Sequence, residues 1–300
     1  MKYRFFSMVH FFSVFLIAFA LLPAVHGEEA PHIAKIVSIS PVLTEIAWEL
    51  GAGELLVGRS QWCDWPPEVL QLPIVGGFSG ASVSIETIRA IDPDIVLLSP
   101  FMHIRLIPLF KRAGIAFFGA DSNSFEEIIE DTRRLGRAIG RDEEGMNLAA
   151  RMLNDLAALD ATLASALPPG VDTSGRNGKG GKGVFYLLQE DPLMSCGRGS
   201  FIDELIARAG GHNIFTEVQE AWPLVSIEAL RLADPDFILM DSQNYARLFG
   251  RGSSYRGPLN KLRAVKAGNI IAIDGDLLSR PGPRLIQAAW ILARALGTVE

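Results

Sequence analysis

Short, largely apolar runs alternate with helical stretches along most of this chain. Six of these runs have the length of a strand, and no charged residue interrupts them: 36–39, 95–98, 115–118, 184–188, 237–240 and 270–273. Continuous apolar runs are typical of strands that are buried on both faces of a parallel sheet. The pattern therefore predicts an α/β fold.

One unit of this pattern occurs twice. Residues 83–98 read VSIETIRAIDPDIVLL, and residues 225–240 read VSIEALRLADPDFILM. In each copy we expect the serine, Ser84 or Ser226, to cap a helix whose first turn contains a glutamate. The Asp-Pro-Asp sequence should end that helix before the strand begins. The repeat predicts two similar α/β lobes.

A helical tract separates the two lobes. Ser124 is a plausible cap, and residues 142–167 place apolar side chains at steps of three and four: Met146, Ala149, Leu153, Leu156, Leu159 and Leu163. At about 1.5 Å per residue, this second helix would reach about 38 Å and brace both lobes. The predicted organisation is an N-terminal lobe over 28–122, a helical bridge over 123–167, a flexible loop over 168–183 and a C-terminal lobe over 184–300.

The first 27 residues have the pattern of a secretory signal peptide. Lys2 and Arg4 precede an apolar run from Phe5 to Leu22, and compact residues stand at 25–27. The alternative is an uncleaved anchor, because the apolar run approaches the ~20 residues that span a bilayer. With no cysteine near Gly27 for lipid attachment, we expect an exported, periplasmic protein.

Composition and charge narrow the possible partners. Hydrophobic residues make up 49% of the chain and charged residues 21%, as in globular proteins. Without the leader, 26 Lys and Arg would face 34 Asp and Glu, which changes the formal net charge from −6 to −8. An acidic chain is a poor partner for nucleic acid or anionic membranes. The histidines of the mature chain are scattered singly, so we expect no metal site and no resident cofactor.

Loops at the carboxyl ends of the strands should carry any binding chemistry. In the N-terminal lobe these loops contain Trp62, beside Trp65, and Phe78. In the C-terminal lobe they contain Met194, Trp222, Asp276 and Arg280. Aromatic rings and a thioether suit an apolar ligand, and an Asp–Arg pair would orient it. The alternative is that the tryptophans are ordinary rim or core residues and that Asp276 with Arg280 forms a surface ion pair or a helix start.

Cys63 and Cys196 are two cysteines in an oxidising compartment, where a disulfide is the default expectation. Both lie in loops that we expect to face each other from opposite lobes. A bond between them would clamp a cleft shut, so we favour free thiols that line the cleft and touch the ligand or its metal.

The chain resembles the periplasmic substrate-binding proteins for cobalamin, haem and iron-siderophores that feed ABC importers, and most closely the cobalamin-binding members. The likeness covers nearly the whole mature chain and rests on the order of several segments, among them 36–41, 64–67, 83–86, 210–215, 222–223 and 280–284. It implies two Rossmann-like lobes bridged by one long α-helix, the class III periplasmic binding protein fold.

The resemblance also implies roles for matching residues. Trp62 stands at the position of a tyrosine that packs on the corrin ring, and Phe78 at that of a tryptophan. Trp222 supplies the other lobe's aromatic, Met194 replaces an aromatic, and Asp276 with Arg280 forms the polar pair that contacts the ligand. Glu86 and Glu228 match acidic residues that dock onto arginines of an ABC permease dimer. Their alternative role is to interact with the helix dipole.

These observations predict a monomeric receptor, not an enzyme, that captures a corrinoid between two lobes and delivers it to a permease. The departures at 62, 78 and 194 change the shape of the cleft, so haem and ferric siderophores stay as alternative ligands. A remote alternative is an exported enzyme with Cys63 as its nucleophile. It lacks a histidine base nearby in the sequence.

Overall fold

The computed structural model describes residues 33–77, 80–167, 180–250, 255 and 257–299. The leader over 1–27 and the proposed ligand residue Phe78 lie outside these ranges, as does most of the loop predicted over 168–183. Within the described ranges, no helix is both long and apolar enough to cross a bilayer.

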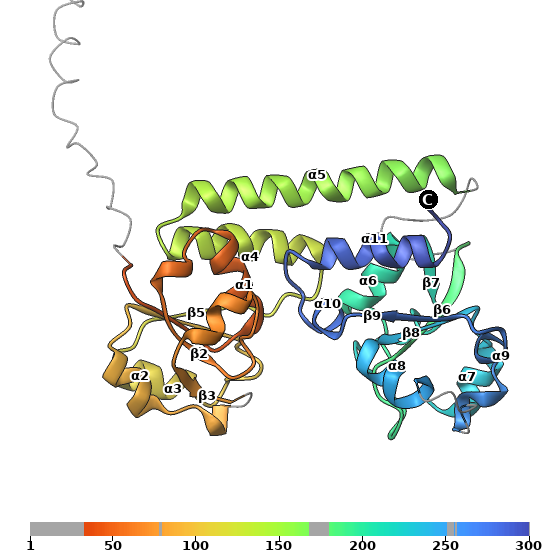
Figure 1. Cartoon of the computed structure of the whole chain (residues 1–300), viewed down its shortest axis with the longest axis horizontal. Coiled ribbons are helices and arrows are strands. Elements are labelled where there is room, and N and C mark those ends of the chain that lie inside the picture. Colours follow the sequence, from red (N-terminus) through yellow and green to blue (C-terminus); the bar gives the residue numbers. More distant parts are fainter. Residues whose placement is uncertain (1–32, 78–79, 168–179, 251–254, 256, 300) are drawn as a thin grey trace, which may run out of the picture.

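Two parallel sheets form the centres of two lobes (Figure 1). The N-terminal sheet has the order β3-β2-β1-β4-β5, with β1 Ile36–Ser38, β2 Leu56–Ser60, β3 Ile74–Gly76, β4 Ile95–Leu98 and β5 Phe117–Gly119. The C-terminal sheet has the order β7-β6-β8-β9, with β6 Lys182–Leu187, β7 Gly211–Asn213, β8 Phe237–Asp241 and β9 Ile270–Ile273. The predicted α/β class with two lobes is confirmed. The first strand of the C-terminal lobe, β6, begins at Lys182.

Helices cover both faces of each sheet. The N-terminal lobe contains α1 Pro41–Glu49, η1 Gly53–Leu55, η2 Pro67–Gln71, η3 Gly80–Ser82, α2 Ile85–Ile91 and α3 Ile107–Ala113. The C-terminal lobe contains α6 Phe201–Arg208, α7 Ile227–Ala233, α8 Ser242–Phe249, η4 Pro258–Lys261, α9 Arg263–Ala267, α10 Gly275–Ser279 and α11 Leu285–Ala295. Helices on both faces explain why the strands of both lobes are apolar on both sides.

The sequence repeat is also a structural repeat. Ser84 Oγ accepts the backbone N–H of Thr87 at 3.1 Å at the start of α2, and Ser226 Oγ accepts that of Ala229 at 3.0 Å at the start of α7. Both helices therefore begin where the sequence predicted, and each capping serine satisfies an N–H that has no partner within the helix.

The Asp-Pro-Asp sequence ends each of these helices and also ties the next strand to the sheet. The first aspartate of each copy takes a left-handed conformation, with φ 54° at Asp92 and 37° at Asp234. The second accepts the backbone N–H of a residue at the start of the neighbouring strand. Asp94 binds that of Lys35, and Asp236 binds that of Gly183, both at 2.8 Å. The repeated unit thus fixes strand position as well as the helix end.

Two helices join the lobes, α4 Phe125–Ala138 and α5 Asp142–Ala166 (Figure 1). A Cβ added at Gly136 of α4 would stand 2.9 Å from the Cα of Gly145, so these glycines permit a close crossing near the turn. The 25 residues of α5 match the predicted helix. Its predicted apolar face is partly wrong, because Met146 and Leu153 are about half exposed. Gly145, Leu148, Ala149 and Met152 are buried with Leu156, Leu159 and Leu163 instead.

One apolar core continues across the bridge. It includes β1 and α1 in the first lobe, α4 and α5 in the bridge, and β6, α6 and α11 in the second lobe. Each lobe has a further, separate cluster on the other face of its sheet. A shared core opposes free rotation of one lobe against the other, because rotation would expose buried apolar surface.

Candidate functional site

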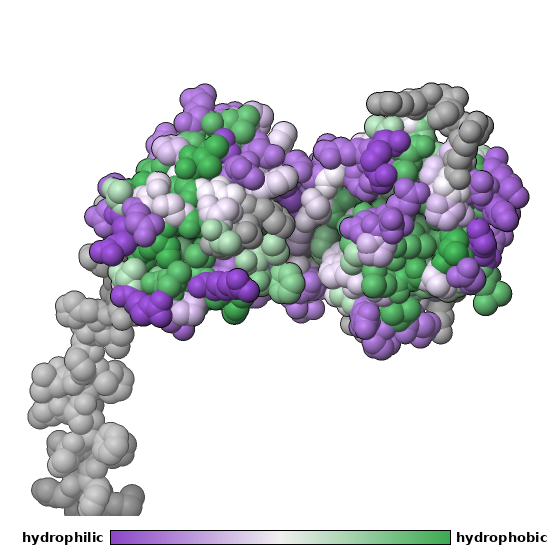
Figure 2. Space-filling model, turned by 90° about the horizontal axis from the view of Figure 1, so that it is seen from below, coloured by the Kyte–Doolittle hydropathy of each residue, from purple (hydrophilic) through white to green (hydrophobic). Residues whose placement is uncertain are grey.

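The lobes meet below the bridge along an indentation (Figure 2). The loop after β2, which contains Trp62 to Trp65, approaches the C-terminal lobe there. Its partners are Arg280, which follows α10, and Arg284, which precedes α11. In parallel sheets the carboxyl ends of neighbouring strands share one edge, so the loop after β2 and the segment after β9 come from the edges where ligands bind in α/β proteins.

Five charged side chains form an ion network across this junction. Glu45 of α1 pairs with Arg280 at 3.1 Å and with Arg284 at 2.7 Å, and the latter contact is bidentate. Arg280 also pairs with Asp64 of the N-terminal lobe at 2.7 Å and with Asp276 of its own lobe at 2.9 Å. Bidentate, charge-assisted contacts fix orientation as well as distance. The network therefore holds the two lobes in register at the indentation.

The centre of the network is buried, its two aspartates are partly exposed, and the network carries excess negative charge. Side-chain exposure is 4% for Glu45 and 9% for Arg280, but 41% for Asp276 and 42% for Asp64. Burial raises the pKa of Asp276, which the charge of Arg280 opposes and that of Asp64 reinforces. Burial alone would lower the pKa of Arg280, but hydrogen bonds with Asp64 and Glu45 outweigh it, and the pKa lies above its ordinary value. Three carboxylates face two guanidinium groups, and both cations are already paired.

The two tryptophans of the β2 loop stand at the exposed rim of this network. Trp62 is 47% exposed, and its carbonyl accepts a hydrogen bond from Arg280 at 3.4 Å. Trp65 is 40% exposed, and the guanidinium of Arg284 lies over its ring, 4.4 Å from the centroid. The structure thus brings Trp62, Asp276 and Arg280 together. Trp65 is held in place by its cation–π contact with Arg284.

Met194 and Trp222 form a second group, confined to the C-terminal lobe. Met194 follows β6 and forms an isolated bridge with Leu224, beside the loop of Trp222. The Trp222 ring is only partly exposed and meets Phe201 edge to face, with centroids 5.6 Å apart. Trp222 therefore packs against its own lobe, with the rest of its surface at the rim.

Two exposed apolar residues at this edge escaped the sequence reasoning. Phe101 is 80% exposed and Ile104 63% exposed, in the turn that follows β4. Asp121 accepts the backbone N–H of Phe101 at 2.6 Å, which fixes the turn. A phenylalanine three residues after a predicted strand was the available signal. The sequence prediction had already assigned the aromatic contacts of this lobe to Trp62 and Phe78.

The expectation that the cysteines line the cleft is wrong. Cys63 and Cys196 are free thiols, but both are 0% exposed. The Cys63 sulfur turns beneath its loop, 3.2 Å from Ser60 Oγ and 3.5 Å from the Ser38 carbonyl. Cys196 belongs to the shared apolar core. Burial raises the pKa of both thiols, so neither is poised to react.

Glu86 and Glu228 are exposed in the first turns of α2 and α7. Both helices lie on the side of their lobes away from α5, one on each lobe (Figure 1). Among the described residues no group of three His, Cys, Asp or Glu is arranged to hold a metal ion.

Comparison with known proteins agrees with this architecture. Residues 36–277 match the model of a family described as periplasmic binding protein. The Vitamin B12-binding protein of Salmonella choleraesuis is 30% identical over 267 residues, which are 89% of this chain and 91% of that protein.

Two solved structures are similar over almost their whole length. The periplasmic vitamin B12 binding protein of Vibrio cholerae has a TM-score of 0.73 and 27% identity, with coverage of 88% of this chain and 97% of that one. The periplasmic haem-binding protein of Roseiflexus sp. RS-1, in its apo form, has a TM-score of 0.72 and 27% identity, with coverage of 88% and 98%. Fold similarity alone does not separate the two ligands.

Proposed function

Because this chain belongs to the periplasmic binding protein family, we propose that it is a periplasmic receptor that captures a corrinoid between its lobes and delivers it to an ABC import permease. The observation that carries the proposal is the similarity to vitamin B12-binding proteins over nearly the whole chain, in sequence and in structure. The exposed Trp62 at the lobe junction supports it, since a macrocycle offers flat apolar faces.

The charge of the junction favours a corrinoid over haem. Haem carries two propionates, and arginines that have no other carboxylate partner bind such groups best. Arg280 and Arg284 are already engaged by Glu45, and Arg280 also by Asp64 and Asp276. A neutral or cationic corrinoid avoids this conflict. Haem is nevertheless the second candidate, because a haem-binding protein has equal structural similarity.

In this proposal Trp62, Phe78, Met194 and Trp222 contact the apolar faces of the ligand, and the half-exposed Asp276 contacts a polar substituent. Arg280 takes part mainly by holding Asp276 in place. A role as an enzyme with Cys63 as its nucleophile conflicts with a fully buried thiol of raised pKa.

Optical titration of the purified protein tests the ligand. Cyanocobalamin should bind with shifted visible bands, and haem should not compete. A dissociation constant for cyanocobalamin weaker than ~100 µM, about −5 to −6 kcal/mol, together with a tight haem complex, would replace the corrinoid proposal with the haem alternative.

Trp62→Ala should weaken cyanocobalamin binding about fivefold or more, because one stacked ring contributes about 1–3 kcal/mol. The matched control is Leu70→Ala, a neighbouring apolar residue that is 51% exposed. Equal affinities of the two variants for cyanocobalamin would show that Trp62 does not contact the ligand.

Delivery through Glu86 and Glu228 is tested separately. The double change of both residues to Gln should abolish uptake and leave ligand affinity intact. Glu143→Gln is the control, because Glu143 is an exposed first-turn glutamate on α5, on the opposite side of the molecule. Weaker ligand binding in the double variant would place these residues in the ligand site instead.

A further inference from the structure

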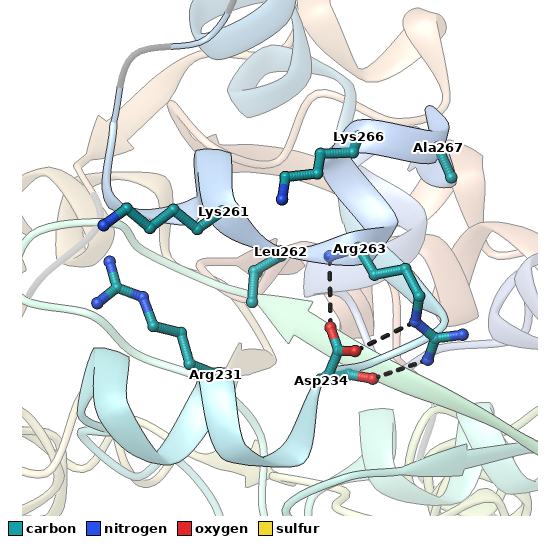
Figure 3. Close-up of a pocket in the computed structure, with 7 residues that line it drawn as sticks. All are labelled: Arg231, Asp234, Lys261, Leu262, Arg263, Lys266 and Ala267. Atoms are coloured by element: carbon teal, nitrogen blue, oxygen red, sulfur yellow. Dashed lines mark hydrogen bonds and ion pairs between the residues drawn. The ribbon is translucent and has the colours of Figure 1, made fainter.

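A basic hollow of about 700 Å³ opens on the C-terminal lobe, between α7 and the segment from η4 to α9 (Figure 3). Arg231 comes from α7, Lys261 from the end of η4, and Lys266 from α9. Arg263 and Asp234 close the remaining side. The hollow lies apart from the ion network at the lobe junction, in a chain with a formal net charge of −6.

Three of its four cations have no carboxylate partner among the described residues. Arg263 is neutralised, since it pairs with Asp234 at 3.1 Å and with Asp236 at 3.0 Å. Among the residues that the structure describes, Arg231 donates only to the backbone carbonyl of Pro258, at 3.4 Å. Lys261 and Lys266 are exposed, and no ion pair engages them within the described part of the chain. The hollow therefore keeps an excess of two positive charges over the two aspartates.

The hollow continues the surface that contains Glu228. Glu228 and Arg231 are three residues apart on α7, a spacing that places both on one side of the helix. Leu232, the next residue, is 90% exposed. Leu232 is also one turn from Glu228, and an exposed leucine beside an acid and a basic hollow is typical of a surface that a partner covers, because apolar anchors surrounded by charge are common in interfaces.

The N-terminal lobe reproduces this feature only in part, because Arg89 of α2 stands at the repeat position of Arg231. Its helix α3 corresponds to α9, since each ends on a left-handed glycine, Gly114 or Gly268, before a strand. Counted back from that glycine, Arg112 matches Lys266, but Leu109 stands where the other lobe has Arg263. Ile107 likewise stands in place of Lys261. The C-terminal lobe thus adds Lys261 and Arg263 to two cationic positions that both lobes share.

We propose that this hollow receives acidic side chains of the ABC permease, so that the C-terminal lobe docks through an acid, an apolar residue and a cation cluster together. Arg231 presents a planar fork suited to a carboxylate, and the two lysines supply further charge at the opposite wall. This inference rests on the proposed delivery to a permease, and it adds that the permease surface facing the C-terminal lobe is acidic next to its cationic contact for Glu228.

Binding of the ligand-loaded receptor to its corrinoid permease in phosphatidylcholine nanodiscs tests the proposal. Lys261→Glu with Lys266→Glu should weaken binding at least about tenfold, mainly through faster dissociation. The matched control is Lys111→Glu with Arg112→Glu on α3, which introduces the same charge change at exposed residues of the other lobe. We expect less than about a twofold effect from the control. Cyanocobalamin affinity should be unchanged in both variants, which excludes misfolding.

Each outcome has a distinct meaning. Equal losses in the two double variants would show general charge attraction and would overturn the inference. If Glu228→Gln weakens permease binding but Lys261→Glu with Lys266→Glu does not, the hollow has no part in docking, and the proposed delivery still stands. If Lys261→Glu with Lys266→Glu abolishes binding to empty phosphatidylglycerol nanodiscs and leaves permease binding unaffected, the hollow binds anionic lipid instead. Insensitivity to both Glu228→Gln and the lysine changes would refute the proposed delivery through this lobe.

Discussion

The ion network at the lobe junction makes a quantitative prediction about Glu45. Its carboxylate is 4% exposed and binds Arg280 and Arg284, both from the other lobe. Glu45→Gln keeps the size of the side chain and removes its charge. The change therefore leaves two guanidinium groups beside a neutral amide that is able to accept only part of their hydrogen bonds.

The size of the effect depends on the carboxylate partners that each arginine retains in the variant. Removing one partner of a buried ion pair costs about 3–5 kcal/mol, because the other charge stays buried without compensation. Arg280 retains Asp64 and Asp276, so the loss falls mainly on Arg284, whose side chain is 22% exposed. We expect the lower end, about 3 kcal/mol. At about 2–4 °C per kcal/mol for a chain of this size, the Tm should fall by about 6–12 °C.

Thermal unfolding at pH 7, followed by circular dichroism, measures this effect. The control is Glu49→Gln, one turn further along α1, where the side chain is exposed. It should shift the Tm by less than about 2 °C, since exposed charges contribute little. Equal shifts in the two variants would refute the view that the network stabilises the contact between the lobes. Added salt should leave the Glu45→Gln effect largely in place, because buried pairs are screened weakly.

Three further outcomes follow from buried or capping groups. Without reductant, a thiol reagent should label neither Cys63 nor Cys196 in the folded protein and both in denaturant; a single labelled thiol in denaturant would contradict the free, buried state. Burial raises the pKa of Asp203, so the folded state holds its proton more tightly than the unfolded state. The stability of the parent relative to Asp203→Asn should therefore fall as the pH rises above the ordinary aspartate pKa of about 4, and urea unfolding that gives a constant difference would refute this. Ser84→Ala and Ser226→Ala should each cost about 1 kcal/mol in urea unfolding, because each removes one helix cap; a neutral result at either serine would refute the capping role.

The regular elements of this fold were largely predictable. The apolar runs at 95–98 and 270–273 coincide with β4 and β9, and the repeat identified the starts and ends of α2 and α7. By contrast β3 and β7 were not predicted. Each has three residues and includes a glycine, so neither periodicity nor propensity marks it. Pairing with a longer strand, β2 or β6, makes each of them a strand.

The candidate site was only partly predictable. From the sequence we predicted that Trp62, Asp276 and Arg280 lie at a site between the lobes. We also expected Arg280 to contact the ligand, whereas the structure pairs it with carboxylates. Glu45 is an unremarkable residue within the sequence of a helix, and nothing local reveals that it binds two arginines more than 200 positions away along the chain. Contacts of this kind depend on how two lobes meet, which no local pattern encodes.

By itself the sequence determined the repeated α/β lobe, the 25-residue bridging helix and the positions of Glu86 and Glu228, because capping, periodicity and strand hydrophobicity act over a few residues. Only the tertiary structure decided which charges are available. It paired Arg280 and Arg284 with Glu45, buried both thiols, and left Arg231, Lys261 and Lys266 around a hollow. Burial and pairing are properties of surfaces brought together from distant segments, and they determine whether a charged residue holds the fold or meets a partner.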